Sequence, residues 1–74
     1  MSRLPVLSAR AIVAKLVRAG FQFKGAHGSH QIYHHPKTGR FTSVPIHGGN
    51  DIGRTLLKKI ITQTGLSVDE FLSL

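Results

Sequence analysis

The sequence contains no cysteine, few acidic residues and no long apolar run. Without cysteine the chain can form neither a disulfide nor a thiolate metal site. A chain this short buries only about 60% of the surface that its unfolded state exposes, so we expect one compact domain over 1–74 that also relies on a partner. No apolar run approaches the roughly 20 residues of a membrane span, and Pro5, Ser8 and Arg10 interrupt any signal-peptide core.

Acidic residues number three against ten Lys and Arg, which gives a net charge of +7. The three acids stand late in the chain, at Asp51, Asp69 and Glu70, and so cannot supply the carboxylate cluster of a two-metal nuclease. The excess of positive charge favours a polyanionic partner, either nucleic acid or an acidic protein surface. Residues 1–20 have the composition of a transit peptide, but their removal would take a helix from a minimal domain. We therefore expect a cytoplasmic protein.

Two stretches repeat apolar residues at the spacing of an amphipathic helix. The first predicts a helix over about 8–19, with Ser8 as its N-cap and Gly20 as its stop. The second predicts a helix over about 52–64 that ends at Gly65.

Capping residues mark the starts of the second helix and of a further short one. Asn50 or Asp51 is expected to cap the helix over 52–64. Ser67 and Glu70 have the spacing of a capping box, which predicts a last helical turn over about 67–73.

Between the long helices the apolar spacing changes to two, which predicts strands. Phe21 and Phe23 begin the first strand, and the next two run over about 29–35 and 40–46. Residues 25–28 and 36–39 carry the glycine and proline of turns, so the three strands form an antiparallel meander. Pro45 lacks an amide donor, which indicates an edge strand or a strand end.

The order α-β-β-β-α with a short C-terminal helix predicts an α+β sandwich. Two helices would bury their apolar faces on one side of a three-stranded antiparallel sheet. Double-stranded RNA-binding domains use this architecture to read RNA shape, phosphates and 2′-hydroxyls. Fold alone does not assign a function.

The candidate reactive residue is His30, in the segment Gly28-Ser29-His30 that joins a turn to a strand. An imidazole at a strand end can face solvent and move a proton near neutral pH, although it can equally be a polar residue that starts a strand. Strand parity puts His30 on the face of Ile32, which we expect to point into the core. We therefore expect the ring at the rim of the sheet, or turned outward by a bulge.

The sequence offers no metal or cofactor motif. It lacks a Cys-His zinc pattern and a Gly-Lys-Ser/Thr phosphate loop, and His27 and His30 lie in a predicted turn and strand rather than on one helix face. Histidine and cations nevertheless suffice to cleave RNA, because RNA carries its own nucleophile in the 2′-hydroxyl. An imidazole can move the proton, and Lys or Arg can stabilise charge on the phosphorane.

Several motifs together resemble the HicA (YcfA-like) toxin family. They are Gly20-Phe21 after a helix, Gly28-Ser29-His30 with Tyr33, Val44-Pro45-Ile46-His47-Gly48, and Gly65-Leu66-Ser67-Val68-Asp69-Glu70-Phe71-Leu72. The resemblance covers nearly the whole chain. It implies an RNA-binding-domain-like fold and an mRNA-cleaving toxin with His30 as its catalytic histidine, held in a hetero-oligomer by a HicB-type antitoxin. Family members commonly carry basic residues ahead of Gly-Ser-His, where this chain has Gly25-Ala26-His27.

Further contacts to RNA are predicted for residues with cationic or polar side chains: Lys24, His27, Ser29, His47, Arg54, Lys58 and Lys59. Each also has a structural interpretation. The helix cations can be a solvated face, and Ser29 can simply start a strand. His34 and His35 are expected at a solvated strand end, and Tyr33 is expected to pack.

Three functions stay open at this point. The first is a metal-independent endoribonuclease toxin with His30 as general acid or base. The second is a non-catalytic RNA-binding domain of the same fold. The third is a module that docks an acidic protein.

Overall fold

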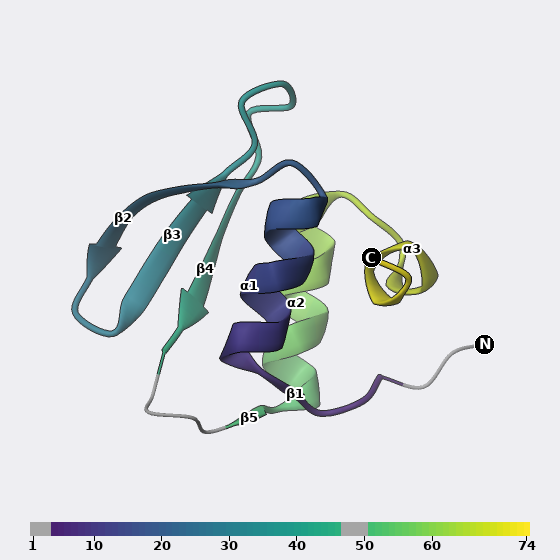
Figure 1. Cartoon of the computed structure of the whole chain (residues 1–74). Coiled ribbons are helices and arrows are strands. Elements are labelled where there is room, and N and C mark those ends of the chain that lie inside the picture. Colours follow the sequence, from purple (N-terminus) through teal and green to yellow (C-terminus); the bar gives the residue numbers. More distant parts are fainter. Residues whose placement is uncertain (1–3, 47–50) are drawn as a thin grey trace.

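The computed structural model describes residues 4–46 and 51–74. Two long helices lie side by side, with an antiparallel sheet on one side of the pair and a short helix on the other (Figure 1). The sheet has the order β2-β3-β4, with strands Gln22–His27, His30–His34 and Phe41–Pro45. The predicted α+β arrangement is confirmed, and Pro45 ends an edge strand as expected. None of the described helices is long and apolar enough to cross a membrane.

Helix α1 (Ala9–Arg18) forms where the apolar spacing predicted it. The hydroxyl of Ser8 accepts the amide of Ala11 at 3.1 Å, which caps the first turn. At the other end Gly20 adopts a φ of +101° and donates its amide to the carbonyl of Val17 at 3.0 Å. That left-handed residue ends the helix and turns the chain toward the sheet.

Helix α2 (Arg54–Thr64) begins two residues later than predicted, because Asp51 does not cap it. Asp51–Ile52 forms a short strand, β5, that pairs antiparallel with β1 (Leu7–Ser8). The N-cap is Gly53, which makes no side-chain capping bond. The expected alternative cap, Asn50, lies outside the described residues.

Helix α3 (Val68–Leu72) carries the predicted capping box. The amide of Ser67 donates to Glu70 Oε1 at 2.8 Å, and the amide of Glu70 donates to Ser67 Oγ at 3.1 Å. The short helix buries Phe71 completely. Lys15 of α1 donates its ammonium to the carbonyls of Leu72 and Leu74 at 3.0 Å each, which ties the C-terminal segment to the first helix.

Strand β2 continues through the glycine-rich segment that the sequence predicted as a turn. A bulge between Phe23 and Gly25 leaves Lys24 without a register partner, and pairing then resumes as far as His27 opposite His30. The turn is therefore the two residues Gly28-Ser29. Gly28 has a φ of +59°, the left-handed conformation that a two-residue hairpin turn requires and that glycine adopts readily. The prediction of a turn over 25–28 was wrong for residues 25–27, which belong to β2.

The core lies between the helix pair and the inner face of the sheet. The sheet supplies buried Tyr33 from β3 and buried Thr42 and Val44 from β4. The helices add Ile12 and Leu16 from α1, and the buried face of α2 is Leu57, Ile60, Ile61 and Thr64. The packing of both helices against β4 fixes where that strand's outer side chains lie relative to α2.

Candidate functional site

His30 is the first residue of β3 and is exposed to solvent. It shares a face of the strand with Ile32, but that face does not point into the core as parity suggested. Tyr33, on the opposite face, is only 4% exposed, whereas Ile32 is half-buried and lies outside the core cluster. The register explains why Tyr33 takes the core side: it pairs with the buried Thr42 of β4, and paired residues share a face. His30 therefore lies on the outer face of the sheet, at its end.

A hollow of about 260 Å³ lies between this end of the sheet and helix α2. The strands contribute His30, Ser43 and Pro45 to its wall, and the helix contributes Leu56, Lys59, Ile60 and Gln63. A histidine and a lysine thus line one small cavity, although their positions are 29 apart in the sequence. Strand β4 brings them together, because it pairs with β3 and also packs against α2.

Two hydrogen-bonded groups line this hollow beside the histidine. Ser43 Oγ lies 3.4 Å from His30 Nδ1, and which of the two donates depends on the imidazole tautomer. Gln63 Oε1 accepts the hydroxyl of Thr42 at 2.8 Å, which holds the amide in place. The serine was not identified from the sequence. Its signal was the alternation of β4, which puts it on the outer face beside β3.

The tip of the β2–β3 hairpin brings a second histidine to the site. His27 pairs directly with His30 in the register, and both are exposed. Side chains at directly opposed positions have Cβ atoms about 4.5–5.5 Å apart and point to the same face. Ser29 is exposed in the turn between them, and its carbonyl accepts the amide of Ile46 at 2.7 Å. The backbone of this turn is thereby anchored to the end of β4.

The cations predicted to contact RNA divide between the hollow and other places. Lys59 lines the hollow, while Lys58 is exposed and is not part of its wall. Arg54 donates its Nε to the carbonyl of Leu4 at 2.7 Å, at the start of α2. Lys24 is exposed in the β2 bulge. His47, the remaining predicted contact, lies outside the described residues.

Two histidines that were expected at a solvated strand end are half-buried instead. His34 packs against Phe41 of the neighbouring strand, with ring centroids 4.4 Å apart and planes inclined by 33°. His35 accepts the amides of Lys37 and Thr38 at its Nδ1, at 3.2 and 3.3 Å. The solvated interpretation was wrong because the ring of His34 packs across the sheet and the ring of His35 accepts amides of the β3–β4 turn.

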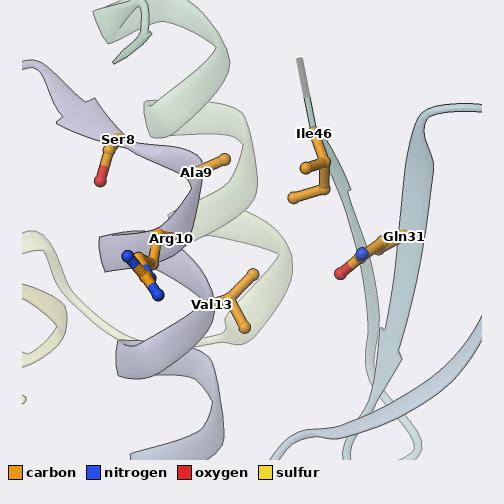
Figure 2. Close-up of a pocket in the computed structure, with 6 residues that line it drawn as sticks. All are labelled: Ser8, Ala9, Arg10, Val13, Gln31 and Ile46. Atoms are coloured by element: carbon orange, nitrogen blue, oxygen red, sulfur yellow. The ribbon is translucent and has the colours of Figure 1, made fainter. Parts of the chain in front are cut away.

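A second hollow, of about 370 Å³, lies between α1 and the sheet (Figure 2). Its wall consists of Ser8, Ala9, Arg10, Val13, Gln31 and Ile46. Val13 and Ala9 extend from α1 toward the strands in Figure 2, so this wall is mainly apolar. None of the residues predicted to act on RNA lines it.

The ionisable groups with shifted pKa values lie away from the first hollow. Burial raises the pKa of Tyr33 above its usual 10.0, so the phenol stays protonated and donates to Gln31 Oε1 at 2.8 Å. The backbone amide of Ser67, aided by its hydroxyl, lowers the pKa of Glu70 in α3. Among the described residues, no three His, Asp or Glu side chains gather as a metal site.

One comparison with known proteins identifies a family. The family model for the HicA toxin of bacterial toxin–antitoxin systems matches residues 9–66, from the first residue of α1 to just beyond α2. The match includes every residue that lines the hollow around His30. Among curated proteins, no sequence matches the chain significantly.

Proposed function

Because the chain belongs to the HicA toxin family of bacterial toxin–antitoxin systems, we propose that it is a metal-independent endoribonuclease that cleaves mRNA in the cytoplasm. The observation that carries this proposal is the exposed imidazole of His30, which shares a hollow with Lys59 and lies 3.4 Å from Ser43 Oγ. A proton-transfer group and a cation are the two elements that RNA cleavage needs beyond the RNA itself.

In the proposed reaction the RNA supplies the nucleophile. His30 accepts the proton of a ribose 2′-hydroxyl, and the 2′-oxygen forms a bond to the adjacent phosphorus. The bond from phosphorus to the 5′-oxygen of the next nucleotide breaks, and that oxygen takes up a proton as it leaves. The products are a 2′,3′-cyclic phosphate and a free 5′-hydroxyl. Lys59 stabilises the negative charge that develops on the phosphorane.

The Ser43 contact supports the role of His30 as a base. When Nδ1–H is donated to Ser43 Oγ, the second ring nitrogen, Nε2, carries the lone pair that accepts a proton. His27, opposite in the register, adds a second imidazole that can carry positive charge beside the phosphate. Lys24, Ser29, His47, Arg54 and Lys58 then serve as contacts to the RNA backbone around this centre.

The partner that controls the activity is proposed to be a HicB-type antitoxin in a hetero-oligomer with this chain. The net charge of +7 suits an acidic surface on that partner as well as RNA, so the two would compete for the same cations.

The test is to incubate the purified chain with an RNA and with the DNA of the same sequence, in EDTA. We expect cleavage of RNA alone, with 2′,3′-cyclic phosphate and 5′-hydroxyl ends. RNA methylated at the 2′-oxygen should stay intact, since its nucleophile is blocked. His30→Ala should abolish cleavage while it retains RNA binding and the melting temperature.

The other functions predict different results. A non-catalytic RNA-binding domain would bind the RNA and leave it whole, and His30→Ala would change nothing but affinity. A module for acidic proteins would bind neither nucleic acid but would hold the antitoxin. Cleavage that survives His30→Ala would overturn the assignment of the base.

A further inference from the structure

The outer face of the sheet carries an aromatic pair that the proposed reaction does not use. Phe41 is 52% exposed, and its ring centroid lies 4.4 Å from that of His34, which pairs with it in the register. The inclination of 33° is closer to stacked than to edge-on. One side chain of this pair is half-buried, while the other leaves about half of its surface to water.

The pair lies on the same face as the candidate catalytic histidine. Residues 30, 32 and 34 alternate onto one side of β3, and residues 41, 43 and 45 face that side from β4. The half-buried Ile32 and Ser43 form the rung between the aromatic pair and His30. The aromatic pair and His30 therefore lie at opposite ends of one face of the sheet.

We propose that His34 and Phe41 form a stacking subsite for one base of single-stranded RNA. The inference rests on the proposed function for its choice of ligand. Every base has a π-face, and proteins that hold single strands use exposed aromatic rings beside cationic grooves. The charge of +7 and the Lys59 hollow supply the cationic part here.

The distance along the strand indicates which base is held. His34 lies four positions after His30, which is about 13 Å of extended chain. This length is several times the rise of about 3.4 Å per stacked nucleotide. The stacked base therefore belongs to a neighbouring nucleotide, not to the ribose that is cleaved. Stacking also requires an unpaired base, so the substrate is single-stranded, although the fold resembles that of duplex-binding domains.

A second exposed phenylalanine provides a matched control. Phe23 is 57% exposed and also contacts an aromatic ring, since its centroid lies 5.8 Å from that of Tyr33. It pairs with Tyr33 in the register and so lies on the inner face, away from His30. A general effect of losing an exposed aromatic would appear in both variants, and a base-stacking effect in Phe41→Ala alone.

The experiment measures binding of the full chain to a single-stranded 2′-O-methyl RNA, which it cannot cleave. A set of such RNAs carries one abasic residue at each position in turn. Wild type should lose affinity roughly 5- to 100-fold when the stacked base is missing. Phe41→Ala should lose a similar factor on the intact RNA and nothing further at that position, whereas Phe23→Ala should stay within about twofold at every position. Phe41→Trp should retain the wild-type pattern.

Several outcomes would overturn the subsite. A flat abasic profile in wild type does so without any variant, even where Phe41→Ala fails to fold. So does an unchanged RNA affinity in Phe41→Ala with weaker antitoxin capture, which would make the pair a protein contact. If the chain cleaves RNA but the abasic profile is flat, the subsite is excluded and the proposed function is supported. If the abasic profile depends on position but no RNA is cleaved, the subsite is supported and the proposed function is excluded. Absence of any RNA binding contradicts both.

Discussion

At the scale of single residues, the contact between Ser43 Oγ and His30 Nδ1 holds the imidazole of the proposed base in place. Ser43→Ala removes one hydrogen bond, and a bond of this kind contributes about 1 kcal/mol. We expect kcat to fall about fivefold with little change in KM, because the serine positions the base and does not hold the RNA. Ser43→Thr keeps a hydroxyl and should restore the rate. A rise in KM at constant kcat would instead make Ser43 a substrate contact.

Lys59 and Lys58 are neighbours in the sequence, but Lys59 lines the hollow and Lys58 does not. The phosphorane charge in the proposed reaction develops in the hollow, so Lys59→Ala should lower kcat/KM by about tenfold or more. Lys58→Ala should change it by no more than about twofold. Lys59→Arg keeps the charge and should recover part of the loss. The measurement is kcat/KM for cleavage of one labelled RNA by each variant. Equal losses in Lys59→Ala and Lys58→Ala would contradict a specific role for Lys59.

The sequence could point to His30 but not to the orientation of its ring. Parity from Ile32 gave the wrong face, because Tyr33 has the larger apolar side chain and takes the core position opposite Thr42. Ser43 carries no chemical signature of its own, so its place beside the imidazole emerges only from the β3–β4 register. Likewise, the spacing of cations on α2 could not separate Lys59 from Lys58, since both lie on its exposed surface.

At the scale of elements, the helices could be predicted and the short strands could not. The helix over 8–19 and the capping box at Ser67 have periodic or paired signals within a few residues. The pairing of Leu7–Ser8 with Asp51–Ile52 joins two-residue segments that are far apart in sequence, and so short a strand has no period. The β2 bulge likewise shifts the hairpin without changing the pattern of residues around it.

The capping box of α3 makes a testable contribution to stability. Ser67→Ala removes the oxygen that accepts the amide of Glu70, and should lower the free energy of unfolding by about 1 kcal/mol. In a domain of this size that corresponds to a melting temperature lower by roughly 4–8 °C. Ser67→Thr is the conservative control and should lose less. Thermal melts of the three proteins at neutral pH measure the difference.

The same box should make stability depend on acid. The amide and hydroxyl of Ser67 hold the pKa of Glu70 below its ordinary 4.5 in the folded chain. A lowered pKa means that the contribution is present above the ordinary value and is lost as the pH falls through the folded value. Glu70→Gln cannot lose this charge, so its melting temperature should fall less than that of wild type between about pH 7 and pH 3. Equal losses would show that Glu70 does not set the acid sensitivity.

At the scale of the whole molecule, a charge of +7 and an aromatic pair make two separable contributions to RNA binding. Contacts to phosphate release counterions, and each lowers the slope of log affinity against log salt by about 0.7 for a single strand. Stacking on Phe41 releases none. Lys59→Ala should therefore make the slope shallower by about 0.7, while Phe41→Ala weakens binding equally at every salt concentration. Titrations of 2′-O-methyl RNA at several KCl concentrations give both slopes. A wild-type affinity that does not respond to salt would exclude phosphate contacts as the source of binding. If Phe41→Ala changed the slope as much as Lys59→Ala, the aromatic pair would act by ordering the cationic hollow and not by holding a base.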